Sequence, residues 1–307
     1  MHLADLVHPK NEDDFIESDF GKELCFLPGE EGRFSQLLNW RDIDHLLRFQ
    51  RLSADMLMVV KGDQVIPAEA YVEQVERYPG HPVPDNRRIT QRRVVPECLE
   101  ELARDGASVV INSLEELHEP IADLACNLEK TLGERVYVNA YLSWGDTSGF
   151  NTHWDDHDVL ILQVLGKKHW RISPPTQVSP MHGSGAPELD GATEAAFDRV
   201  ITSGDVLHVP RGWWHLVTPV NEPSIHLTIG LTKRTGVHFL SWLSNEMVNE
   251  ESFRTDISRR GGAPRREHLE NLSKILSNYL EDESVLERYL DSHTRATPGR
   301  SRFNLDL

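Results

Sequence analysis

The stretch 151–168, NTHWDDHDVLILQVLGKK, decides how the rest of the chain is interpreted. Five of its first eight residues are His or Asp, side chains that bind metal ions, and an almost unbroken apolar run follows them. A short apolar run that ends at a glycine is typical of a buried strand. Two interpretations are open at this point. The polar residues form either a loop that covers the end of a strand or a metal site at the mouth of a barrel.

The sequence on both sides of this stretch favours a β structure. From Val136 onward, short β-branched or aromatic runs alternate with Gly, Pro and Asp, namely VYVNAYLSW, VLILQVL, KHWRIS, DVLHVP and SIHLTIGLT. Many short strands separated by turn residues are typical of a closed antiparallel β structure. We therefore expect a mainly β fold with flanking helices, and any chemistry inside the barrel.

Helical patterns flank the β region. Residues 10–60 and 96–133 are predicted to be largely helical, with a short strand at ASVVINS in the second segment, whereas 80–96 reads as an extended loop. Past about Gly236 the chain turns helical again, and one face there carries Leu269, Leu272, Leu276, Tyr279 and Leu280. That face either packs on the barrel or forms a dimer seam. We expect domains at 1–235 and 236–307.

The metal interpretation rests on residues with a defined spacing. In a strand, residues two apart point to the same side, so His153 and Asp155 present an imidazole and a carboxylate to one ion. His215, which follows a Pro-x-Gly turn in GDVLHVPRGWWHLV, is the candidate third ligand. Two His and one carboxylate leave coordination positions open, as non-haem Fe(II) oxygen chemistry requires. Asp156, His157 and Asp158 are competing candidates that we expect to be loop or supporting residues. His208 is expected to be a packed core side chain.

Open coordination positions call for an organic co-substrate, usually an acid that needs a cation at its far end. Lys167 and Lys168 are adjacent, so they cannot both face inward, and Lys168 shares parity with Leu160, Leu162 and Val164. A lysine inside a barrel is costly unless it is paired with an anion. The parity favours Lys168 as a carboxylate anchor; two solvated turn lysines are the alternative.

Composition limits the function. The formal net charge of −17 argues against a nucleic-acid binder, which needs clustered Lys and Arg, and would suit a basic partner. Three separated cysteines are typical of reduced thiols, and neither a signal pattern nor a membrane-length apolar run is present. We expect a cytoplasmic protein that contacts no membrane.

The motifs resemble the JmjC-type branch of the cupin superfamily, and more narrowly the Fe(II)- and 2-oxoglutarate-dependent ribosomal oxygenases. The similarity lies in the order and spacing of four segments: VNAY at 138–141, GFNTHWDDHDVLILQVLGKKHWRI at 149–172, GDVLHVPRGWWHLV at 204–217 and SIHLTIGL at 224–231. It implies a double-stranded β-helix, or jelly roll, and a dioxygenase that uses Fe(II), 2-oxoglutarate and O2.

The resemblance also implies residue roles. His153, Asp155 and His215 would be the iron ligands, and Lys168 would bind the distal carboxylate of 2-oxoglutarate. Asn139 and Tyr141 would hydrogen-bond the co-substrate or metal-bound water. Thr228, inward on the same strand as His226, is a weaker candidate for a pocket position.

The implied reaction is hydroxylation of a side chain of a protein or peptide, with a homodimer as an expected assembly. The same chemistry on a small metabolite or peptide natural product is an alternative, as are lysine demethylation and a non-catalytic metal-binding cupin. Ribosomal oxygenases usually carry a helical dimerisation region and a winged-helix-like domain after the barrel. About 70 residues follow Gly236 here, too few for both, so substrate recognition is expected to be reduced or different.

Overall fold

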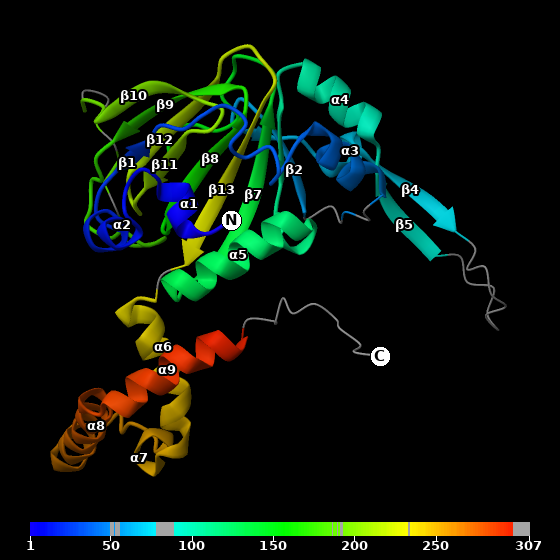
Figure 1. Cartoon of the computed structure of the whole chain (residues 1–307). Helices are drawn as coiled ribbons and strands as arrows, with labels where there is room; N and C mark the ends of the chain where they lie inside the picture. Colours follow the sequence, from blue (N-terminus) through cyan, green and yellow to red (C-terminus); the bar gives the residue numbers. More distant parts are fainter. Residues whose placement is uncertain are drawn as a thin grey trace, which may run out of the picture. The chain divides into compact units, whose positions relative to one another are not determined.

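The computed structural model describes residues 1–49, 52, 56–77, 89–185, 187–188, 190, 193–232 and 234–296. Backbone contacts divide the chain into two compact units, Met1–Thr232 and Lys233–Leu307, which are described separately (Figure 1). The first unit holds all of the strands described below.

Thirteen strands are found in the part of the chain that the structure describes, and the strand pairs among them are antiparallel. Their bounds are β1 Cys25–Leu27, β2 Leu57–Lys61, β3 Gln64–Val65, β4 Val72–Arg77, β5 Ile89–Val94, β6 Ser108–Ile111, β7 Arg135–Ser143, β8 Asp158–Leu165, β9 Lys167–Ser173, β10 Phe197–Thr202, β11 Val206–Val209, β12 Trp214–Pro219 and β13 Ser224–Thr232.

These strands build two principal sheets. The larger has the order β1-β11-β8-β13-β7-β6-β2-β3, the smaller has the order β10-β9-β12, and β4 and β5 form a separate hairpin. Crossed connections between two antiparallel sheets define a jelly roll, so the predicted mainly β fold is confirmed. The hydrogen-bonded ladders do not close into a ring among the described strands, because β9, β10 and β12 pair only with one another.

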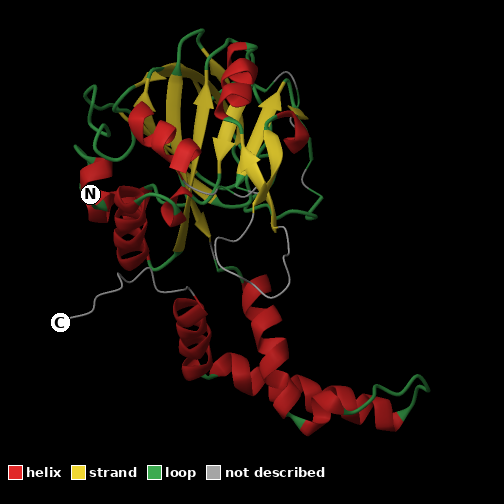
Figure 2. Ribbon diagram, turned by 90° about the vertical axis from the view of Figure 1, so that its right-hand side faces the viewer, coloured by secondary structure: helices red, strands yellow, loops and turns green. Residues whose placement is uncertain are grey.

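The helices of the first unit lie outside its sheets (Figure 2). They are α1 Leu3–Val7, α2 Glu12–Ser18, α3 Trp40–Phe49, α4 Pro96–Arg104 and α5 Glu119–Leu132. The α4–β6–α5 order confirms the helix, strand and helix expected over 96–133. The largely helical prediction for 10–60 is partly wrong, because Cys25–Leu27 pairs with β11 and Leu57–Lys61 pairs with β6. In the predicted loop 80–96, residues 80–88 lie outside the described residues and Ile89–Val94 is a strand.

Strand β8 is covered on both faces, which explains its continuous apolar run. The side chains of Leu160 and Leu162 pack into the main core, whereas Val159 and Ile161 belong to a second cluster with Trp170 and Ile172 from the smaller sheet. Each fully buried aliphatic side chain contributes about 1.5–3 kcal/mol to folding. Within the larger sheet, β8 thus directs one face at the smaller sheet and the other at the main core.

A single residue, Gly166, joins β8 to β9. Its φ is +65°, and a Cβ at this position would lie 2.3 Å from the carbonyl oxygen of Pro223. Only glycine meets both constraints at low cost. The tight turn fixes the parity of β9, so that Lys168 is buried and Lys167 is exposed.

The second unit is helical, as expected past Gly236. Its helices are α6 Gly236–Glu246, α7 Glu251–Arg254, α8 Ala263–Glu281 and α9 Glu283–Ala296. Leu276 and Tyr279 of the predicted apolar face pack on a small core inside this unit, but Leu269 and Leu280 are exposed. In the described residues of the chain, no helix combines the length and the apolar character needed to cross a membrane.

Candidate metal centre

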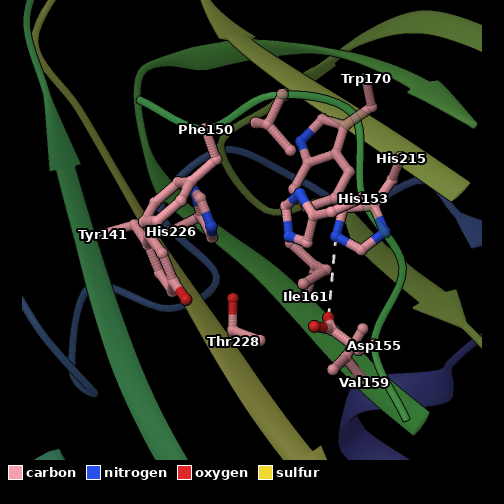
Figure 3. A pocket seen from close by; sticks show the side chains of 11 residues that line it. Tyr141, Phe150, His153, Asp155, Val159, Ile161, Trp170, His215, His226 and Thr228 are labelled. Carbon is pink, nitrogen blue, oxygen red and sulfur yellow. Dashed lines mark ion pairs between the residues drawn. The ribbon is translucent and has the colours of Figure 1, made fainter. Parts of the chain in front are cut away.

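Three side chains with metal-binding atoms meet at the edge between the two sheets. One ligand atom from each of His153, Asp155 and His215 lies within 4.8 Å of the other two. His215 Nε2 lies 3.7 Å from Asp155 Oδ2, and the two imidazole centroids are 4.3 Å apart (Figure 3). These separations suit one ion between the three groups.

Backbone pairing brings these distant parts of the sequence together. His153 N–H donates to the His215 carbonyl at 3.1 Å, and His215 N–H donates back to the His153 carbonyl at 2.7 Å. Gly212 N–H donates to the carbonyl of Asp155 at 2.9 Å. Asp155 lies in the loop before β8 rather than inside a strand, and the hydrogen bond from Gly212 holds its backbone. The expectation that strand alternation aligns His153 with Asp155 is wrong in that respect.

The two histidines carry their protons on the side away from the cluster. His153 Nδ1 faces the Asn151 carbonyl at 2.8 Å, and His215 Nδ1 faces the Trp213 carbonyl at 3.1 Å. A carbonyl only accepts, so each Nδ1 donates and each Nε2 keeps a lone pair. Metal-binding histidines in proteins almost always have this arrangement. The donor set therefore fits a divalent transition metal.

Burial favours the neutral form of the His215 imidazole. The pKa of His215 is lowered by burial, and the nearby Asp155 carboxylate partly opposes that shift. Metal ligation requires a neutral imidazole. The site thus presents His215 in the form that binds a cation.

A cavity opens beside these three residues. Figure 3 shows it between the two sheets. It is lined by Tyr141, Phe150, His153, Asp155, Val159, Ile161, Trp170, His215, Val217, His226 and Thr228. The wall is mostly apolar and aromatic, and a few polar groups are set into it, as is usual for a small-molecule site.

Lys168 is buried behind this cavity and has no carboxylate partner among the described residues. Its side chain is 2% exposed, and Nζ donates to the Tyr141 carbonyl at 3.2 Å and lies 2.8 Å from His226 Nδ1. Burial lowers the pKa of this amine to about 7. A buried ammonium of this kind fits an anionic ligand that is not part of the chain.

The other predicted polar residues lie on the two adjacent strands β7 and β13. Tyr141 and Thr228 line the cavity, but Asn139 does not; its Oδ1 accepts from the Ser113 backbone N–H at 3.1 Å. Burial raises the pKa of Tyr141 to about 12, which keeps the phenol protonated as a donor, and a hydrogen bond with Asn139 partly opposes that shift. Asn139 is thus placed to orient Tyr141.

The competing candidates lie outside the cluster. Asp156 pairs with His157 at 3.1 Å, and Asp158 accepts from the Arg211 backbone N–H at 2.8 Å. His208 is fully buried against Phe15 and Phe20, as predicted for a core histidine.

Sequence reasoning assigned no role to three ring-bearing residues that line the cavity, Phe150, Trp170 and His226. For two of them, the alternation of side chains along a strand could have predicted a position facing the cavity. Trp170 lies two residues after Lys168, and His226 lies two residues before Thr228. The aromatic rings of Trp170 and His215 stack with centroids 6.1 Å apart, so the indole packs against this histidine inside the cavity.

A jelly roll that brings together a His-x-Asp pair and a distal His is consistent with the JmjC-type cupins that the sequence resembles. Residues 116–239 match the family model described as a JmjC domain. The predicted resemblance to this class is thereby confirmed.

The particular proteins that the chain resembles are ribosomal oxygenases and their relatives. It is 24% identical over 94% of its length to a bifunctional lysine-specific demethylase and histidyl-hydroxylase NO66 from Drosophila pseudoobscura pseudoobscura, and 27% identical over 92% to that from Dictyostelium discoideum. The chain spans only 31% and 52% of these two relatives.

A solved structure agrees with the fold. The ribosomal oxygenase YcfD from Escherichia coli, in complex with cobalt and 2-oxoglutarate, superposes with a TM-score of 0.61 at 17% identity. The match covers 92% of this chain and 70% of YcfD. At this identity the likeness shows that the two proteins share a fold.

Proposed function

We propose that this chain is an Fe(II)- and 2-oxoglutarate-dependent dioxygenase that hydroxylates a side chain of a protein or peptide. The observation that carries the proposal is the buried Lys168, which has no carboxylate partner among the described residues and lies behind the cavity that His153, Asp155 and His215 border. A metal store needs the three donors but has no use for a buried cation nearby. A co-substrate with a carboxylate at its far end needs both.

We propose a role for each residue of the site. His153, Asp155 and His215 would hold Fe(II) through two Nε2 atoms and one carboxylate oxygen. Lys168 would bind the distal carboxylate of 2-oxoglutarate. Tyr141 and Thr228, whose side chains line the cavity, would donate hydrogen bonds to the co-substrate, and Asn139 would orient Tyr141.

Bound iron and 2-oxoglutarate supply the oxidation: O2 converts the co-substrate to succinate and CO2, and one oxygen atom ends as a hydroxyl group on the substrate. The protein would position the reactants and exclude water from them. Phe150, Val159, Ile161 and Val217 form apolar walls that keep bulk water from the metal side of the cavity. The carbonyls of Asn151 and Trp213 hold the imidazoles in one orientation throughout.

The net charge of the chain and the names of its relatives support a proposal for the substrate and partners. A histidyl-hydroxylase name occurs among the relatives, and YcfD is described as a ribosomal oxygenase. The net charge of −17 suits a basic protein partner. We extend the proposal to the domains: 1–235 is the catalytic part, and 236–307 serves dimerisation or substrate recognition. The exposed side chains of Leu269 and Leu280 support a contact role for the latter.

The test is incubation of the protein with Fe(II), 2-oxoglutarate and a lysate of its host, followed by a peptide mass search. We expect one or few peptides to gain the mass of a single oxygen atom, and none to do so with the Asp155→Ala variant. A demethylase would instead remove methyl groups from lysines. Tight metal binding with neither change, and no succinate, would favour a non-catalytic cupin.

A further inference from the structure

Two buried basic side chains, of which one lines the cavity, lie in contact with each other. Lys168 Nζ and His226 Nδ1 are 2.8 Å apart, and the two side chains are 2% and 4% exposed. No carboxylate among the described residues forms an ion pair with either group. A pair of this kind is expensive to bury unless its net charge is kept low.

The contact fixes the protonation of the imidazole. An ammonium only donates hydrogen bonds, so a charged Lys168 requires Nδ1 of His226 to accept, and the ring proton then lies on Nε2. Two cations at this distance repel strongly, so the pair carries one positive charge. Burial, followed by the nearby Lys168, lowers the pKa of His226 well below its usual value, in keeping with a neutral ring.

The orientation of the ring directs that proton. The ring is stacked on Tyr141 with centroids 4.7 Å apart and planes within 5°, and it lies edge-on to Trp170 at 5.5 Å. Of the two basic residues, His226 lines the cavity, whereas Lys168 is not among its lining residues (Figure 3). Because Nδ1 points back to Lys168, the opposite edge of the ring, with Nε2, is the edge left for the cavity.

A second buried histidine shows what a purely structural role looks like in this fold. His208 Nδ1 donates to the Glu23 carbonyl at 2.9 Å, and its Nε2 accepts from the Gly21 backbone N–H at 3.5 Å. The backbone thus occupies both nitrogens of His208. In His226, Nδ1 contacts a lysine, and no hydrogen bond of Nε2 to a described residue is found.

We propose that His226 is a second binding residue for the distal carboxylate of the co-substrate, donating from Nε2 while Nδ1 orients the Lys168 ammonium. The pair then offers one carboxylate a single positive charge and two directed donors, and it distinguishes a dicarboxylic 2-oxo acid from a monocarboxylic one. This inference rests on the proposed dioxygenase function and deepens it.

The test measures ligand binding rather than turnover. Cobalt-loaded protein is titrated in a calorimeter with 2-oxoglutarate and with 2-oxopentanoate, which has the same carbon chain without the distal carboxylate. A hydrogen bond to a charged group corresponds to about a tenfold to hundredfold change in affinity. His226→Phe keeps an aromatic ring to stack on Tyr141. It should lower the affinity for 2-oxoglutarate by that factor and leave the affinity for 2-oxopentanoate unchanged.

Two further variants sharpen the comparison. His226→Gln keeps an N–H donor near Nε2 and should recover part of the lost affinity for 2-oxoglutarate. His169→Gln removes a half-exposed imidazole on the opposite face of the strand that carries Lys168. It should change the affinity for neither ligand. Cobalt affinity, measured in parallel, checks that each variant is folded.

A structural readout supports the assignment independently. In ¹⁵N spectra of the imidazoles, His226 should carry its proton on Nε2, and that resonance should shift with 2-oxoglutarate but not with 2-oxopentanoate. Equal losses for both ligands in His226→Phe, or no loss, would overturn the inference. If the wild-type protein fails to bind 2-oxoglutarate at all, the proposed function fails first, which is a different result.

Discussion

His153 and His215 are hydrogen-bonded to each other through their backbones in both directions, and their rings lie 4.3 Å apart. This two-way pairing holds both imidazoles beside Asp155, with His215 Nε2 3.7 Å from Asp155 Oδ2. The donors therefore need little reorganisation to bind an ion, because the backbone already holds their positions. We therefore expect metal affinity to depend on this backbone pairing.

Asp155→Ala should abolish iron-dependent formation of succinate and weaken metal binding by more than about a hundredfold, since loss of a supporting group alone costs 10–100-fold. Cobalt titration and a succinate assay check this. Asp156→Asn is the matched control, because Asp156 is similarly exposed but faces His157 and His182. Its cobalt affinity should stay within about twofold of wild type. Wild-type turnover by Asp155→Ala would remove this residue from the site.

The affinity for 2-oxoglutarate should fall as the pH rises above about 7. Burial lowers the pKa of Lys168 to about 7, so the free protein loses this positive charge above that pH, whereas a bound carboxylate favours the charged form. Binding at higher pH therefore takes up a proton, and the affinity falls by up to about tenfold per pH unit. Below pH 7 the dependence should flatten.

Calorimetry in two buffers of different ionisation enthalpy measures this proton uptake directly. The controls are the ligand 2-oxopentanoate, which has no distal carboxylate and should show no uptake at this group, and the variant Lys168→Met, which should bind 2-oxoglutarate weakly at every pH. A pH-independent affinity in the wild-type protein would show that Lys168 keeps its charge in the free state.

Gly166→Ala should destabilise the protein by more than the strain of a positive φ alone. The new Cβ would meet the Pro223 carbonyl at 2.3 Å, so the turn before Lys168 must shift. Gly133→Ala is the matched control, because Gly133 has a φ of +68° and no atom within 4 Å of its virtual Cβ. Positive-φ strain costs about 1–3 kcal/mol. Thermal unfolding should show a larger loss of stability for Gly166→Ala than for Gly133→Ala, and Gly166→Ala should also bind 2-oxoglutarate more weakly. Equal losses of stability in the two variants would contradict the packing argument.

The double variant Leu269→Glu with Leu280→Glu tests the helical unit. Both side chains are about half exposed, at 48% and 52%, so the unit should stay folded. Sedimentation should then show a lower mass if the face mediates dimerisation. An unchanged mass with loss of substrate hydroxylation would assign the face to recognition, and a change in neither would exclude both roles for it.

The β region was predictable because its signals are local. Each apolar run between turn residues became a strand, and parity around Gly166 correctly separated Lys168 from Lys167. The segments Cys25–Leu27 and Leu57–Lys61 were missed because they are strands through pairing with β11 and β6, which no local pattern reveals. Local composition alone predicts helices over both segments.

The sequence was enough to predict which residues form the candidate site, but not which backbone contacts bring them together. Spacing brought His153, Asp155 and His215 into one hypothesis, and they do lie together. Their alignment, however, comes from the bridge between His153 and His215 rather than from alternation along one strand. His226 was overlooked as a binding residue because its meaning depends on contact with Lys168, which is 58 residues away in sequence.

The most direct test of the central claim is anaerobic addition of Fe(II) and 2-oxoglutarate, together and separately, with the visible absorption recorded. The account predicts a weak charge-transfer band that needs both additions and disappears in Asp155→Ala. A folded wild-type protein that binds Fe(II) yet gives no such band with 2-oxoglutarate would contradict it.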